Sequence, residues 1–273
     1  MELRTERMLT WLTASSFDRH PGLCHAFSTR LGGASRYPYR GLNLGLKTQD
    51  LPACVQANRI RFLSQFGIRP EEAVSLSFVH SNRVAYIGEE DKGKGYLDLG
   101  SVPAEADGMV TNAKRCALFV TFADCPPVLF YDPYHQAIGA CHAGWRGTVS
   151  GIAGETVRAM TMYFESDPAE IEVVIGPCIG PDVFEVSTEV IEAVQGHSGN
   201  WMDLLRESPY DHKALFDIRL ALTWQLEGAG IRGENIDHID LCTFSRNDLF
   251  FSHRRSFADT GRMGAFIMLD GAV

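Results

Sequence analysis

The chain has 273 residues, a formal net charge of −9 and 45% hydrophobic residues, which is enough for a sizeable core in one large domain or two ordinary ones. An acidic chain without a run of basic residues argues against nucleic-acid binding, since phosphate contacts require clustered Lys and Arg. No stretch reaches the roughly 20 apolar residues of a membrane span, and the N-terminus lacks a signal peptide's apolar segment, so we expect a cytoplasmic protein without a membrane partner. Seven cysteines at irregular spacings indicate reduced thiols.

Two segments near the N-terminus carry polar residues of interest. Residues 22 to 29 predict a strand, and RLGGAS at 30 to 35 predicts a Gly-Gly turn behind Arg30. YRGLNLG at 39 to 45 predicts a loop with Asn43 between two leucines. On spacing alone, turn chemistry is the simpler explanation of Arg30 and Asn43, and a ligand contact is the alternative.

A helix is expected to follow this loop. Asp50 is a candidate N-cap with Pro52 in the first turn, and the helix should end near Phe66. The residues we expect it to bury are Val55, Ile60 and Leu63.

His80 lies at the turn of a predicted strand–turn–strand segment, residues 74 to 87. A single histidine there is most simply a surface or hydrogen-bonded residue. Residues 105 to 111, EADGMVT, predict a turn that leads into a strand, and Asp107 has the simple interpretation of a turn residue.

The most informative stretch is residues 121 to 147, TFADCPPVLFYDPYHQAIGACHAGWRG. Apolar runs at 116 to 123, 126 to 131 and 137 to 141 predict buried strands. Cys125 lies between the first two runs, and His142 follows the third. Because buried strands place side chains reproducibly, a thiolate and an imidazole at strand ends are suited to a rigid site.

Residues 147 to 164 predict one helix, and a turn flanked by glycines precedes it. That turn places Arg146 beside free backbone N–H groups, which is a plausible anion site. A structural ion pair is an equally good explanation of Arg146. The helix face expected in the core carries Ala153, Val157, Met160 and Phe164.

The C-terminal part mixes strands with helices. Residues 171 to 181 predict a strand in which Cys178 is more simply a buried thiol than a ligand. Strands mixed with helices and the lack of a detectable linker indicate one α/β or α+β domain over residues 1–273. The remaining expected elements are a helix from about Thr188 to Val194, a less regular stretch at 196 to 212, a helix marked by Leu215, Ile218, Leu222 and Leu226, and strands at 239 to 244, 249 to 252 and 264 to 269.

Three functional interpretations stay open from these residues alone. His80, Cys125 and His142 form a His2Cys set, which can hold zinc with one open position, or copper, although their spacings match no zinc finger. Cys125 and His142 can instead form a nucleophile and base pair of a hydrolase. The third interpretation is no catalysis, with a thiol and two imidazoles merely buried.

Several long motifs resemble one known family. TFADCPPVLFYD, AIGACHAGWRGT, VIGPCIGPDVFEV and CTFSRNDLFFSHRRSFADTGRMGAFI are similar to successive signatures of the YfiH/YlmD laccase-domain family. FSTRLGGAS, GLNLG and VHSNRV match too, so the resemblance covers nearly the whole chain. Two departures are Phe78, where the family often has Gln, and Phe184, where Tyr is common.

The resemblance implies a fold, a cofactor and substrates. The fold would be a single α-β-β-α sandwich related to the catalytic domain of cytotoxic necrotizing factors. His80, Cys125 and His142 would hold a catalytic zinc, or copper under an older assignment as a polyphenol oxidase. Members phosphorolyse adenosine, inosine and methylthioadenosine and deaminate adenosine, and some are linked to peptidoglycan editing. Purine nucleosides and phosphate are therefore the expected small-molecule partners.

The implied reactions suggest further site residues. Phosphorolysis needs a phosphate against C1′ of the ribose, and guanidinium groups bind phosphate through two parallel hydrogen bonds. Arg30, Arg146 and the pair Arg254 and Arg255 are therefore candidates, with Asn43 as a further substrate contact. Deamination needs an activated water, which zinc would supply. No glutamate beside the three ligands offers itself as general acid, so that role stays unassigned.

Overall fold

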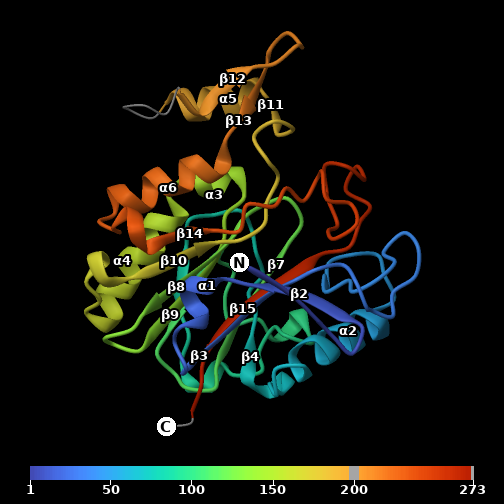
Figure 1. The fold of residues 1–273 in the computed structure, drawn as a ribbon, viewed down its shortest axis with the longest axis vertical. Helices are drawn as coiled ribbons and strands as arrows, with labels where there is room; N and C mark the ends of the chain where they lie inside the picture. The colour runs from blue at the N-terminus through green and yellow to red at the C-terminus, as the bar shows by residue number, and fades with distance from the viewer. Residues whose placement is uncertain (197–202, 272–273) are drawn as a thin grey trace.

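The computed structural model describes residues 1–196 and 203–271. Within these residues the strands form two six-stranded sheets and one three-stranded sheet (Figure 1). Residues 197–202, part of the stretch expected to be less regular, lie outside the described residues. No helix in the described part of the chain is long and apolar enough to span a bilayer.

The first sheet has the strand order β1-β2-β3-β15-β7-β4 and the second β14-β10-β8-β9-β6-β5. Most neighbours pair antiparallel, and the parallel pairs are β4 with β7, β5 with β6 and β10 with β14. The first sheet consists of β1 Glu2–Glu6, β2 Leu9–Thr13, β3 Leu23–Ser28, β15 Met263–Leu269, β7 Ala117–Phe122 and β4 Ala73–Val74. The second consists of β14 Ile236–His238, β10 Glu172–Ile175, β8 Pro127–Asp132, β9 Ala137–His142, β6 Gly108–Thr111 and β5 Val84–Tyr86.

Helices cover the outer faces of both large sheets (Figure 1). α2 (Pro52–Ser64) packs on the first sheet, and α4 (Ile152–Phe164) and α6 (Ile218–Gly228) pack on the second. The layers thus follow the expected α-β-β-α order. The expected likeness to cytotoxic necrotizing factors and the single domain over residues 1–273 stay predictions. The short helices are α1 (Ser15–Asp18), α3 (Trp145–Val149) and α5 (Thr188–Gln195).

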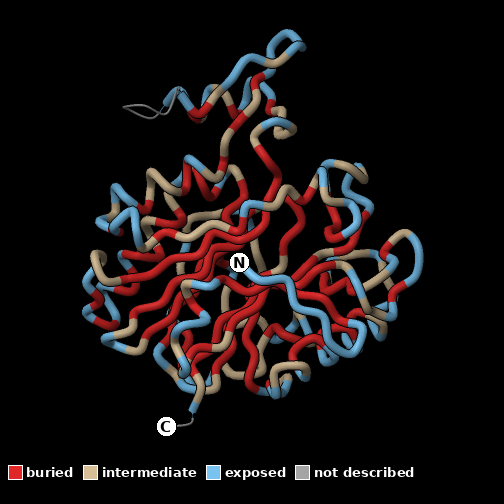
Figure 2. Tube along the Cα trace, viewed as in Figure 1, coloured by how far each residue is buried: buried red, intermediate tan, exposed pale blue. Residues whose placement is uncertain are grey.

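A small sheet, β11-β13-β12, lies with α5 at one end of the molecule (Figure 1). Its strands are β11 Glu185–Ser187, β13 Lys213–Phe216 and β12 Leu205–Glu207. Its apolar residues form a cluster with α5 and with the start of α6. Figure 2 shows that it is more exposed than the two large sheets.

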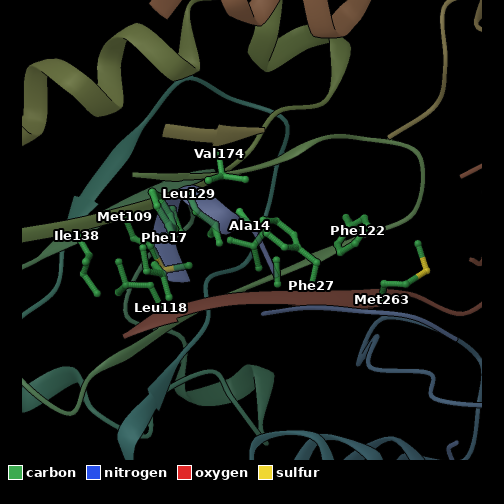
Figure 3. Close-up of a cluster of buried hydrophobic side chains, with 14 of the residues drawn as sticks. Ala14, Phe17, Phe27, Met109, Leu118, Phe122, Leu129, Ile138, Val174 and Met263 are labelled. Carbon is green, nitrogen blue, oxygen red and sulfur yellow. The ribbon is translucent and has the colours of Figure 1, made fainter. Parts of the chain in front are cut away.

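The main core lies between the two large sheets (Figure 3). Alternation along β7 explains it, because Leu118, Val120 and Phe122 face this core while Ala117 and Phe119 face α2. β8 alternates in the same way between the central core and the layer of α4 and α6. A strand that is buried on both faces carries apolar residues at successive positions, which explains the continuous apolar runs in the sequence.

The helix expected from Asp50 to Phe66 differs in two details. Its N-cap is Leu51, and the Asp50 carboxylate instead accepts a hydrogen bond from the Leu51 N–H at 2.8 Å. Ile60, expected in the core, is 43% exposed. The helix instead buries Asn58 and Arg59, whose side chains form hydrogen bonds with the backbone of neighbouring loops.

Other expected elements are shorter than their patterns suggested. The helix over 147 to 164 is divided into α3 and α4, because Gly151 has a φ of 89° that an α-helix cannot accommodate. Residues 239 to 244 and 249 to 252 are loops, apart from a single bridge between Cys242 and Cys178. Leu215, expected in the last helix, lies in β13.

Candidate metal centre and active site

The structure brings together the three ligand candidates His80, Cys125 and His142, whose ligand atoms all lie within 4.8 Å of one another. His142 is the last residue of β9, and its pairing with Pro127 of β8 sets it beside the turn that carries Cys125. His80 comes from the bend between β4 and β5 and has a φ of 60°, which turns the chain sharply there.

Hydrogen bonds to the Asp107 carboxylate orient both His80 and His142. Its buried carboxylate accepts hydrogen bonds from the N–H groups of Val79, His80 and Ser81 at 3.1, 3.0 and 2.7 Å. One of its oxygens also lies 3.1 Å from Nδ1 of His142. A metal-binding histidine ordinarily donates its second ring N–H to such a carboxylate, which leaves Nε2 of His142 for the ion.

The charges of the site follow from these contacts. Burial alone would raise the pKa of Asp107, but His142 and the surrounding N–H groups lower it to about 2. Burial would lower the pKa of His142, yet Cys125 and Asp107 raise it to about 9. Burial and the neighbouring His142 lower the pKa of His80, so its imidazole is neutral at pH 7.

Gly144 leaves room for two of the ligand side chains, those of His80 and Cys125. A Cβ atom at this position would lie 2.7 Å from Nδ1 of His80 and 3.3 Å from Sγ of Cys125. The first distance is shorter than real Cβ contacts allow, so any other residue would push His80 out of place. The first glycine of the motif HAGWRG, Gly144, is therefore required because a residue with a Cβ atom would collide with the His80 ring.

These residues fit a transition metal. Two imidazoles and a thiolate are a donor set that would hold zinc or copper, and a set of three protein ligands would leave the ion able to bind a further small ligand. The hydrogen bond from His142 to Asp107 supplies the orientation that such sites require.

A cavity of about 560 Å³ opens beside the ligand cluster. Phe78 and Phe184 both line it, and the Phe78 ring lies 5.3 Å from the His142 ring. Apolar walls with a few convergent polar groups are typical of small-molecule sites.

The substrate-binding candidates from the sequence separate into two groups. Arg146 and Arg254 line the cavity. Arg146 forms a 2.7 Å ion pair with Glu189 of α5, and Arg254 donates to the Glu185 carbonyl at 2.7 Å. Arg255, the neighbour of Arg254, donates to three backbone carbonyls instead.

Arg30 and Asn43 are not among the residues that line the cavity. Arg30 lies over the Phe251 ring and donates to Asn247. The Asn43 side chain bonds to Thr48, to Asp50 and to the N–H of Gly45, which is turn chemistry. Their role in substrate binding stays a prediction.

Sequence reasoning missed four residues of this region, Asp107, Lys47, Arg59 and Arg262. Asp107 precedes a glycine before a strand, which is an ordinary turn pattern. Arg59 lies one residue before Ile60, which was expected in the core, and the structure buries Arg59 instead, so the apolar pattern gave no signal for it.

The layers and the His2Cys cluster define an α-β-β-α protein with a candidate metal centre. The family model described as multi-copper polyphenol oxidoreductase laccase matches residues 24–270, and the chain belongs to this family. The resemblance to the YfiH/YlmD proteins is therefore confirmed.

Named relatives give the same result. The chain is 36% identical over 241 residues to purine nucleoside phosphorylase YlmD of Bacillus subtilis, covering 88% of this chain and 86% of that one. It is 36% identical over 251 residues to purine nucleoside phosphorylase YfiH of Escherichia coli, covering 91% and 94%. The crystal structure of YlmD from Geobacillus stearothermophilus superposes with a TM-score of 0.90 at 32% identity, covering 98% of both chains.

Proposed function

We propose that this protein is a zinc-dependent purine nucleoside phosphorylase that also deaminates adenosine. The observation that carries the proposal is the cluster of His80, Cys125 and His142 at the wall of a cavity with aromatic and cationic side chains. The names of the relatives support the phosphorylase reaction.

The phosphorolysis can be written as one balanced exchange. An oxygen of monohydrogen phosphate forms a bond to C1′ of the ribose while the bond from C1′ to N9 of the base breaks. The base keeps the electron pair of that bond and takes the phosphate proton, so adenosine, inosine or methylthioadenosine yields a free base and a ribose 1-phosphate. The protein must therefore hold the base, the ribose and an anion in one cavity.

The cavity is lined by side chains suited to the purine base and to the anion. The rings of Phe78 and Phe184 provide apolar surface for the purine, and Arg146 and Arg254 are proposed as substrate contacts at the same wall. A zinc ion, when bound, acts as a Lewis acid and lowers the pKa of a coordinated water toward roughly 7, which is the chemistry that deamination requires.

One assay tests the proposal. Adenosine with phosphate should give adenine and ribose 1-phosphate, and adenosine alone should give inosine, both resolved by chromatography. A zinc-loaded protein that converts none of the three nucleosides in either assay would contradict it.

Copper-dependent oxidation of phenols is the second candidate, because a thiolate with two imidazoles also suits copper and the family model is described as a laccase. Turnover of phenols only, and only after copper loading, would favour this function. A Cys-His hydrolase, including one that edits peptidoglycan, predicts instead a Cys125 thiol that iodoacetamide labels without a chelator.

A further inference from the structure

The cavity beside the metal centre is basic although the protein is acidic. Five cationic side chains line it, and among the described lining residues the one carboxylate is that of Asp124. Asp124 is already engaged, since its oxygens accept hydrogen bonds from Thr243, Ser252 and the N–H of Arg254. The five cations are Lys47, Arg59, Arg146, Arg254 and Arg262.

Arg59 is the most unusual of the five because it is buried without a counter-charge. Its guanidinium carbon lies 5.1 Å from the centre of the Tyr96 ring and 5.0 Å from that of the Phe119 ring, and the residue is only 2% exposed. Its guanidinium donates to the carbonyl groups of Leu44 and Tyr96 and, within the described residues, to no carboxylate. A buried charge is costly unless it is paired, so an anion in the cavity is its natural partner.

Arg262 and Arg59 both contact the loop that contains Leu44. The Leu44 N–H donates to the Arg262 carbonyl at 2.8 Å, and Arg59 donates to the Leu44 carbonyl at 2.7 Å, so residue 44 joins the two arginines. Gly45 makes the approach possible, since a Cβ atom there would lie 2.7 Å from Cγ of Arg262. The Arg262 guanidinium bonds to two backbone carbonyls and, in the part of the chain that the structure describes, forms no ion pair.

Arg262 lines the same cavity as the ligand candidates Cys125 and His142. Burial lowers the pKa of its guanidinium. Lys47, three residues after Leu44, lines the same cavity and bonds to Ser77 and to the Phe78 carbonyl. Three cations from separate parts of the chain thus line one cavity.

We propose that Lys47, Arg59 and Arg262 form the binding subsite for inorganic phosphate, the co-substrate of the proposed phosphorolysis. A dianion with several acceptor oxygens matches two guanidinium groups and an ammonium group. Arg146 is a weaker choice, because Glu189 already neutralises it. The inference rests on the proposed function for the identity of the anion, and on the three cations that line the cavity for its location.

Direct binding tests the location without turnover. Phosphate is titrated into zinc-loaded full-length protein by calorimetry at constant ionic strength, for the wild type and for Arg262→Gln, Lys47→Gln and Arg59→Met. Each variant should weaken phosphate binding about tenfold or more, because a charge-assisted contact is lost. Lys114→Gln and Arg158→Gln remove exposed charges of the same kinds elsewhere and should bind phosphate as the wild type does. Lys47 is exposed, so its variant keeps the test valid if Arg59→Met fails to fold.

Steady-state kinetics separate this inference from the proposed function. In Lys47→Gln and Arg262→Gln the KM for phosphate should rise by a larger factor than the KM for the nucleoside, because the lost cation contacts the phosphate. Phosphorolysis with an unchanged phosphate KM in Lys47→Gln and Arg262→Gln would overturn the subsite and leave the function standing. Phosphate binding that these variants abolish, in a protein that phosphorolyses no nucleoside, would overturn the function and leave the subsite standing. If the variants weaken binding of adenosine 5′-monophosphate but not of free phosphate, the anion is a nucleotide phosphate and the assignment to inorganic phosphate is wrong.

Discussion

The carboxylate of Asp107 controls two of the three ligand candidates at once. Through backbone N–H groups it fixes the bend that carries His80, and through Nδ1 it fixes the ring of His142. The N–H of His142 also donates to the Asp107 carbonyl at 2.8 Å. Asp107, which is not itself a ligand candidate, therefore orients His80 and His142 toward the same metal position.

Asp107→Asn should lower zinc affinity about 10- to 100-fold, because the amide can accept from fewer of these donors and carries no charge to orient His142. Competition with a chromophoric chelator measures the change. Asp124→Asn is the matched control, since Asp124 also lines the cavity but bonds to residues 243 to 254. Equal loss of affinity in both variants would show that Asp107 has no particular role.

Gly144→Ala should remove the metal without unfolding the protein. The added methyl group would have to occupy space 2.7 Å from the His80 ring, so the ligand moves while the two sheets stay packed. Elemental analysis and circular dichroism report metal content and fold on the same sample. Gly154→Ala, in α4 with its nearest neighbour atom 4.0 Å away, should keep the zinc and gain about 0.5–1 kcal/mol of stability. Retention of zinc by Gly144→Ala would contradict the spatial argument.

At the level of secondary structure, α2 does more than cover a sheet. Its apolar residues pack on the first sheet, while buried Asn58 binds the N–H of Ala34 and the carbonyl of Asn43. Arg59 from the same face reaches the cavity. The helix thus fixes the loops of residues 34 to 45 and carries a proposed phosphate ligand.

The 3-10 helix η1 (Pro70–Glu72) after α2 is tied by an ion pair to the connection between β6 and β7, which carries Arg115. Glu72 is buried and accepts from Arg115 at 2.9 Å and from the N–H of Arg69 at 2.9 Å. Burial alone would raise the pKa of Glu72, but Arg115 and Arg69 lower it to about 2. A depressed carboxyl pKa contributes stability that is present above its unfolded value near roughly 4.3 and is lost as the pH falls toward 2.

Glu72→Gln should therefore lower the free energy of unfolding by about 1–3 kcal/mol at pH 7, since Arg115 loses its buried partner but stays partly solvated. Denaturant titrations from pH 7 to pH 2 should show the difference from wild type shrinking below about pH 4.3. Glu71→Gln, the exposed neighbour in the same element, should match the wild type throughout. A difference that stays constant down to pH 2 would rule out the ion pair as its cause.

Across the whole molecule, the ligand candidates join the two sheets. Cys125 follows β7 of the first sheet and precedes β8 of the second, and His142 ends β9 of the second. A metal held by both would stabilise the folded state alone, because the unfolded chain separates the three ligands.

Purified protein should contain about one zinc per chain, and a chelator should lower its melting temperature. At a free zinc concentration of about 1,000 times Kd the expected stabilisation is about 4 kcal/mol. Cys125→Ala should lose most of the zinc and should melt at the same temperature with or without chelator. Cys54→Ala, on α2, should behave as the wild type. Full zinc content in Cys125→Ala would remove Cys125 from the ligand set.

Local patterns along the chain were enough to predict several of the elements. Continuous apolar runs ended by turn residues predicted β7, β8 and β9, because strands buried on both faces need apolar side chains at every position. The ends of those runs located Cys125 and His142, and the motifs that flank them identified the family. The split of the helix at Gly151 was not predicted, because the spacing of apolar residues continues across a glycine whose φ depends on the packing of both halves.

Which polar residues act together could not be predicted from local patterns and became visible in the folded chain. Asp107 resembles a turn residue, and Arg59 resembles an ordinary polar residue of a helix, because their partners are far away in the sequence. Asp107 meets His142 across 35 positions, and the loop at residue 44 joins Arg59 to Arg262 from the other end of the chain. A local pattern carries no record of such contacts, since they form only when the two sheets and their covering helix pack together and exclude water.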